Sequence, residues 1–80
     1  MVDTDTELVM QTINRLIDDM DERHIRPLHI RPERIANELQ APFESIRIAL
    51  RTLYKEGKTK EVQGINHIYI TIPHKLQPHV

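Results

Sequence analysis

The sequence predicts an α+β fold, in which three helices and a small three-stranded antiparallel sheet form one domain. Two observations support this prediction. Over most of residues 5 to 55, apolar side chains recur every three or four positions, which is the period of an amphipathic helix. From residue 67 to residue 72, apolar and polar side chains instead alternate, as they do in a half-buried strand. The expected order of elements is helix, strand, helix, helix, strand, strand.

The first helix is expected over residues 5 to 22. Thr4 and Glu7 have the spacing of a capping box, in which each side chain binds the other residue's backbone N–H at the start of a helix. The helix should bury one face, because its apolar residues fall together at helical spacing. These residues are Leu8, Val9, Ile13, Leu16, Ile17 and Met20.

The letters HIRP then occur twice, at residues 24 to 27 and again at 29 to 32. A proline favours an extended conformation in the residue before it, and Pro32 also suits the first turn of a helix. The segment Leu28-His29-Ile30 is therefore predicted to be a short strand that completes the sheet. A metal site at His24 and His29 is disfavoured, because no cysteine and no suitably spaced carboxylate accompanies them.

Pro32 begins the second helix, which carries Ile35, Ala36 and Leu39 inward and is broken at Gln40-Ala41-Pro42. The third helix is expected from Phe43 to Lys55, and Gly57 supplies a left-handed stop after it. The buried stripe of the third helix is expected to contain Ile46, Ala49, Leu50, Leu53 and Tyr54.

A hairpin is predicted from Thr59 to Ile72, with a tight loop at residues 64 to 66. In its second strand Ile68, Ile70 and Ile72 alternate with His67, Tyr69 and Thr71. Two strands alone are marginally stable, so the hairpin needs a third strand and the helices beneath it. The domain is thus expected to span residues 1 to 73, and residues 74 to 80 are expected to be a flexible tail.

Composition excludes several classes of protein. The chain has no cysteine, which removes disulfides and thiolate zinc sites. No apolar run approaches the roughly 20 residues needed to cross a bilayer, and the N-terminus is acidic, so a soluble cytoplasmic protein is expected. A phosphate-binding glycine loop and a nucleophile with a paired base are both missing, so neither an enzyme nor a cofactor-binding protein is expected.

The charge is distributed unevenly along the chain, although the net charge is only −1. Residues 1 to 25 hold seven acidic and two basic side chains, whereas residues 26 to 60 hold eight basic and four acidic ones. The middle of the chain therefore carries a net charge of +4. This asymmetry suggests an anionic partner for that segment, although charges of both signs also serve simply to solvate a small protein.

The segment ERIANELQAPFESIRIALRTLYKEGKTKEVQG resembles the winged helix-turn-helix of bacterial transcriptional regulators, and most closely the GntR-type pattern. In that pattern a helix ends in leucine, a tight turn follows, and the next helix ends in leucine-x-x-x-glycine before the wing. The resemblance covers roughly residues 5 to 73. It implies that the third helix enters the major groove of DNA and that the hairpin wing lies on the backbone. The sequence departs from the pattern at Gln40, where a glycine is usual, and in a wing without arginines.

On the third helix, Glu44, Arg47, Ile48, Arg51 and Lys55 share the face opposite the buried stripe. Arginine pairs with guanine, glutamate accepts from cytosine, and an aliphatic side chain contacts the thymine methyl group. Lys58 and Lys60, at the base of the wing, are expected to contact phosphate. The full set of expected DNA-binding residues is Arg34, Phe43, Glu44, Ser45, Arg47, Ile48, Arg51, Lys55, Lys58, Lys60, Asn66 and His67.

Two interpretations compete with sequence-specific binding of double-stranded DNA by a homodimer. The winged helix also serves as a protein adaptor, and here Phe43, Ile48 and the acidic first helix would be its contacts. Alternatively, the exposed face of the third helix is an ordinary solvated surface. Among DNA-binding roles, the sequence leaves transcription, replication and mobile-element control open.

Overall fold

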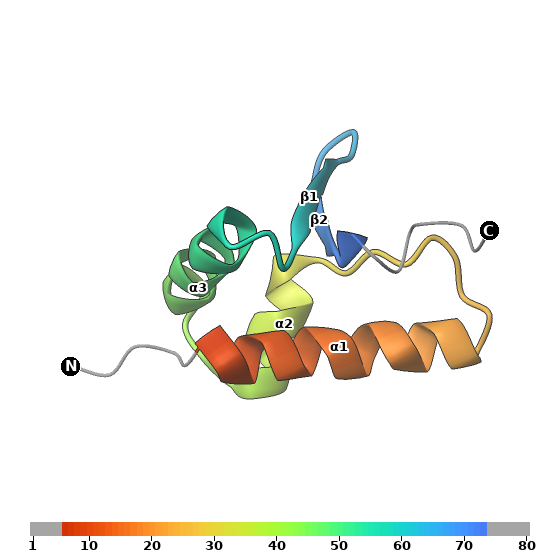
Figure 1. Ribbon diagram of the computed structural model, residues 1–80, viewed down its shortest axis with the longest axis horizontal. Helices are drawn as coiled ribbons and strands as arrows, with labels where there is room; N and C mark the ends of the chain where they lie inside the picture. The colour runs from red at the N-terminus through yellow and green to blue at the C-terminus, as the bar shows by residue number, and fades with distance from the viewer. Residues whose placement is uncertain (1–5, 74–80) are drawn as a thin grey trace.

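The computed structural model describes residues 6–73 of the chain and contains three helices followed by an antiparallel hairpin (Figure 1). The elements are α1 (Thr6–Glu22), α2 (Pro32–Leu39), α3 (Phe43–Lys55), β1 (Lys60–Gln63) and β2 (Ile68–Thr71). In Figure 1, α2 crosses α1, and the hairpin projects away from α1. This arrangement confirms the α+β class and is consistent with a winged-helix-like arrangement. Thr4 of the expected capping box and the expected tail at residues 74 to 80 lie outside the described residues.

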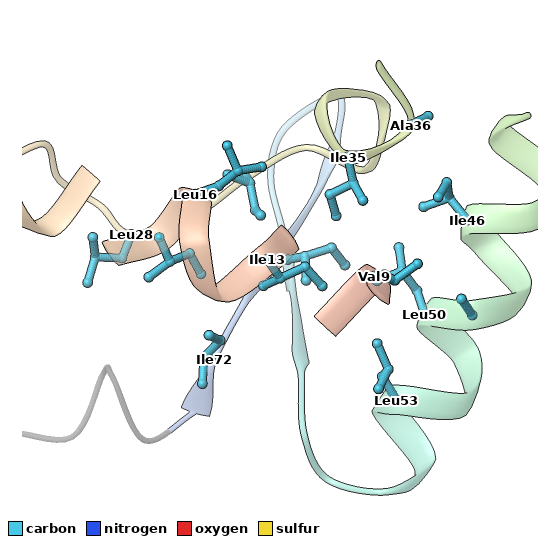
Figure 2. Close-up of a cluster of buried hydrophobic side chains, with 14 residues drawn as sticks. Val9, Ile13, Leu16, Leu28, Ile35, Ala36, Ile46, Leu50, Leu53 and Ile72 are labelled. Atoms are coloured by element: carbon cyan, nitrogen blue, oxygen red, sulfur yellow. The ribbon is translucent and has the colours of Figure 1, made fainter. Parts of the chain in front are cut away.

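One hydrophobic core joins all three helices to the hairpin (Figure 2). α1 contributes Val9, Ile13, Leu16 and Ile17. In Figure 2, Val9, Ile13 and Leu16 lie among the labelled side chains of α2, α3 and the segment after β2. The other buried apolar residues are Leu28, Ile30, Ile35, Ala36, Ile46, Ala49, Leu50, Leu53, Ile70 and Ile72. Burial of these side chains provides the main stabilisation of so small a chain. None of the helices in residues 6–73 has the length and hydropathy to span a membrane.

The inward faces of two helices are narrower than the sequence predicted. Leu8 is 46% exposed and Tyr54 is 55% exposed, so neither belongs to the buried face on which it was expected. Met20 and Leu39 are only partly buried and pack against the edge of the core. The expected burial of Leu8 and Tyr54 was wrong because each lies at the border of its apolar stripe, where neighbouring elements decide exposure.

The predicted third strand is reduced to a single residue. Ile30 and Ile70 form an isolated bridge, with Ile30 N–H···O=C Ile70 at 2.9 Å and Ile70 N–H···O=C Ile30 at 2.7 Å. The backbone N–H of His29 turns instead to the carbonyl of Pro27 at 2.9 Å. Pairing cannot extend further along the chain, because Pro32 lacks an N–H and already begins α2. The sheet therefore has two strands, and the expectation of three was wrong.

All three helices end in the same hydrogen-bonded motif, in which one residue adopts a left-handed conformation. The left-handed residues are His24 (φ 61°), Gln40 (φ 50°) and Gly57 (φ 76°). In each case the next N–H bonds a carbonyl five residues earlier: Ile25 to Met20 at 2.8 Å, Ala41 to Ala36 at 3.0 Å, and Lys58 to Leu53 at 2.9 Å. This pattern is the Schellman motif, which glycine favours because it has no Cβ. The turn after α2 thus forms with glutamine in a position that suits glycine.

The hairpin has a defined register. Glu61 pairs with Ile70 and Gln63 pairs with Ile68, so these four side chains share one face of the sheet. In the loop, the N–H of Gly64 donates to the His67 carbonyl at 2.7 Å. A Cβ at Gly64 would lie 2.7 Å from the ring of Tyr69, so the loop requires a residue without a side chain there.

Candidate functional site

The outward face of α3 is the most cationic surface that a single helix presents in residues 6–73. Its inner face, formed by Ile46, Ala49, Leu50 and Leu53, packs into the core against α1 and α2. The opposite side is solvent-exposed, as the sequence predicted, and it carries Glu44, Arg47, Ile48, Arg51 and Lys55. Three cations against one carboxylate give this face a local charge of +2.

Ion pairing separates the basic side chains into two groups. Arg47 Nη1 donates to both carboxylate oxygens of Glu44, at 3.0 and 3.2 Å, in an exposed ion pair along the helix surface. Arg51 and Lys55 form no ion pair with any other described residue, and the same holds for Lys60 at the start of β1. These three side chains are therefore free to meet an external anion.

Most other basic side chains in the described part of the chain are already paired with carboxylates. Arg34 lies 3.9 Å from Glu38, which also accepts a 2.9 Å bond from Arg15 and so joins α1 to α2. Lys58 lies 3.3 Å from Glu56. The remaining pairs are Arg23–Asp19, Arg26–Asp21 and Arg31–Glu33. Within the middle segment, the cations without an ion-pair partner among the described residues thus lie in the C-terminal half of α3 and at the start of β1.

A groove of about 770 Å³ separates α3 from the hairpin. Leu50 and Ile70 form its floor, because both are buried and both line it. One wall is the flank of α3 and carries Phe43, Arg47, Arg51, Tyr54 and Lys55. The other wall is the sheet face and loop, with Glu61, Gln63, Asn66, His67 and Ile68, while Pro32 and Glu33 close one end. The groove therefore has an apolar floor and a polar rim, in which three cations on α3 face two carboxylates, Glu33 and Glu61.

Six of the twelve expected DNA-binding residues line this groove. They are Phe43, Arg47, Arg51, Lys55, Asn66 and His67. Glu44 and Ile48 lie farther around α3 on its outward face, and Ser45 is half-buried on the other side. Arg34 lies on α2, Lys58 lies in the loop after α3, and Lys60 is the first residue of β1. The structure thus brings together the third helix and the wing tip but leaves Arg34 apart from them.

Eight of the fourteen groove residues were not among the expected DNA-binding residues, and they include Tyr54, Gln63 and Ile68. Tyr54 was placed in the core, and Ile68 was only assigned to one face of its strand, together with Ile70 and Ile72. Both side chains remain largely exposed because the hairpin projects beyond the helices. The alternation of β2 did carry the signal for Ile68, since it placed this residue on the same face as Ile70.

Tyr69 lies on the opposite face of the hairpin and contacts two histidine rings. The rings of His29 and Tyr69 have their centroids 5.6 Å apart, and His67 approaches Tyr69 edge-on at 6.4 Å. These contacts give His29 a packing role. No group of three potential metal ligands occurs within residues 6–73.

No family model matches this chain, and neither does any curated protein or solved structure.

Proposed function

We propose that this protein binds double-stranded DNA through the outward face of α3, with the hairpin lying along the phosphate backbone. The single observation that carries the proposal is the availability of Arg51 and Lys55. Both lie on an uncovered helix face and lack an ion-pair partner among the described residues, whereas nearly all other described cations are paired. Free cations on one helix face are what binding to a polyanion requires.

The shape of this region supports the same proposal. An α-helix fits the major groove of B-DNA, which is about 12 Å wide. α3 exposes its outer side over its whole length, and the hairpin projects beside it (Figure 1). Lys60 is free at the base of the hairpin, and Asn66 and His67 are exposed at its tip. Side chains on both elements can therefore contact one duplex, those of α3 at base edges and those of the hairpin at phosphates.

A dimer is part of the proposal, because a single copy offers few phosphate contacts and two copies double them. Helix-turn-helix proteins commonly place two recognition helices one DNA turn apart. We expect sedimentation analysis to detect two copies on one duplex, and a strictly monomeric complex at high micromolar concentration would remove this part of the proposal. The resemblance of residues 33 to 64 to bacterial transcriptional regulators supports a role in transcription.

The test of the proposal is selection of duplexes from a randomised library, followed by a band-shift titration with the enriched site. We expect enrichment of a defined site and binding that weakens steeply as salt increases. The absence of salt-sensitive binding to any duplex would overturn the proposal.

The groove supports a second candidate function, that of a protein adaptor. Phe43, Tyr54 and Ile68 are exposed around a floor of Leu50 and Ile70, and such an apolar recess suits an apolar side chain of a partner. Ile48 and the acidic first helix, the other contacts expected for an adaptor, do not line this groove. A partner held through Phe43 and lost in Phe43→Ala, together with no binding to any duplex, would favour this function over DNA binding.

A further inference from the structure

The outward face of α3 contains one aliphatic side chain, Ile48, that the fold itself does not use. Ile48 is 58% exposed, which is more than any other apolar residue in the described helices. It lies outside the core and does not line the groove beside α3. The other aliphatic residues of α3 are all buried. Ile48 is thus an isolated apolar contact point in the middle of a cationic face.

Two of the polar side chains one turn from Ile48, Glu44 and Thr52, already have partners within α3. Both carboxylate oxygens of Glu44, one turn earlier, bond Arg47. The hydroxyl of Thr52, one turn later, donates to the Ile48 carbonyl at 3.4 Å. Ile48 itself therefore offers a ligand an apolar contact, and the polar side chains one turn away that have no partner among the described residues are those of Ser45 and Arg51.

Only one base edge in the major groove offers a matching apolar group, the 5-methyl group of thymine. We infer that Ile48 contacts a thymine methyl in the preferred duplex and is a specificity-determining residue. The inference rests on the proposed function and adds to it the class of site that is preferred.

The position of Arg51 extends the inference to a second base. Ile48 and Arg51 are three residues apart, which corresponds to about 4.5 Å along the helix axis. Successive bases on one strand are about 3.4 Å apart, so the two side chains reach neighbouring base pairs. A free arginine pairs best with the O6 and N7 atoms of guanine. The preferred site therefore contains a thymine next to a guanine–cytosine pair.

The experiment uses the full chain and the duplex enriched from a randomised library. Each thymine is replaced in turn by deoxyuridine, which removes the 5-methyl group and leaves the hydrogen-bonding groups unchanged. Binding is measured for the parent protein, for Ile48→Ala and for a matched control, Leu8→Ala. Leu8 is also an exposed aliphatic residue on a helix, but it belongs to α1.

We expect one thymine at which replacement by deoxyuridine weakens binding of the parent protein about four-fold. This factor corresponds to about 0.8 kcal/mol, the contribution of one buried methyl-sized group. Ile48→Ala should bind the thymine duplex about four-fold more weakly and should show no further loss with deoxyuridine. Leu8→Ala should behave like the parent protein.

Three results would overturn the inference while leaving DNA binding intact. These are an enriched site without thymine, equal binding to every deoxyuridine duplex, and a deoxyuridine effect that persists in Ile48→Ala. If no duplex at all is enriched, the proposed function itself is overturned, and the inference is overturned with it. Circular dichroism melting of Ile48→Ala is the control for unfolding. Because Ile48 is exposed, the melting temperature of the variant should equal that of the parent protein.

Discussion

The hydroxyl of Thr71 donates a 2.7 Å hydrogen bond to the carbonyl of Leu28, which lies 43 residues earlier in the chain. Thr71 is fully buried, and Leu28 is nearly so. This bond and the backbone pair between Ile30 and Ile70 hold the segment before α2 against β2. A side-chain hydroxyl thus attaches this segment to β2, as the backbone groups of a third strand would.

Replacing this hydroxyl should destabilise the fold. Thr71→Val preserves the side-chain shape but leaves the Leu28 carbonyl without this donor in a buried place, so we expect a loss of about 1–3 kcal/mol in the free energy of unfolding. Thr59→Val is the matched control, because Thr59 is also buried but its hydroxyl has no partner among the described residues. Urea titrations should show little loss or a gain for Thr59→Val, and equal losses for both variants would contradict this account.

The segment between the two HIRP sequences should depend on Ile30 rather than on its histidines. Ile30 is buried, so Ile30→Ala should reduce the free energy of unfolding by about 2–5 kcal/mol. A variant with both His24 and His29 replaced by alanine should lose at most about 1.5 kcal/mol, chiefly from the ring contact between His29 and Tyr69. Thermal melts test both. A histidine variant less stable than Ile30→Ala, or a parent protein stabilised by zinc, would contradict the prediction.

The left-handed residues after the helices offer a stabilisation test. His24→Gly and Gln40→Gly should each raise the free energy of unfolding by about 0.5–1 kcal/mol. A left-handed conformation costs residues other than glycine about 1–2 kcal/mol, and glycine's greater freedom in the unfolded chain cancels part of the gain from relieving that cost. Gly57→Ala should lower the free energy of unfolding by a similar amount for the reverse reason. Chemical denaturation should give opposite signs for the two kinds of change. A loss of stability in Gln40→Gly would contradict the left-handed turn.

The elements that sequence predicted well are those whose pattern is local. The bounds of α2 and α3 follow from Pro32, Pro42 and Gly57, which restrict the backbone whatever surrounds them. The prediction of a third strand was wrong because strand pairing depends on which backbone N–H and carbonyl groups a partner strand can reach. In the segment before α2, only Ile30 both donates a backbone hydrogen bond to β2 and accepts one from it. The hydrogen bond from Thr71 to Leu28 could not be predicted for the same reason, because it depends on a segment 43 residues away in the chain.

The candidate site was only partly predictable for a similar reason. Helical spacing located the exposed face of α3, since the residues opposite a buried stripe must face solvent. The groove requires the relative position of α3 and the hairpin, and that position is set by the core, so Tyr54 and Ile68 could not be assigned to it from spacing alone. Spacing also cannot reveal that Arg51 is free and that Arg34 shares Glu38 with Arg15.

The lysines beside the hairpin should differ in their contribution to DNA binding. Lys60 is free among the described residues, whereas Lys58 is 3.3 Å from Glu56. Lys60→Ala should weaken binding to all duplexes and reduce the slope of affinity against salt by roughly one unit, as expected for one lost phosphate contact. Lys58→Ala should change the slope less, because Glu56 already neutralises part of its charge. Titrations at several salt concentrations compare the two, and a larger effect of Lys58→Ala would contradict the prediction.

The central claim, that α3 reads DNA through its outward face, is tested most directly by the affinity of Arg51→Ala for the selected duplex and for a random duplex. Arg23→Ala is the matched control, because Arg23 is also an exposed arginine but lies just after α1, paired with Asp19. Anisotropy titrations should show that Arg51→Ala loses about 1–3 kcal/mol on the selected duplex and less on the random one. Arg23→Ala should bind both duplexes like the parent protein. Equal losses on both duplexes would mean that α3 only contacts the backbone, and unchanged binding by Arg51→Ala would contradict the claim.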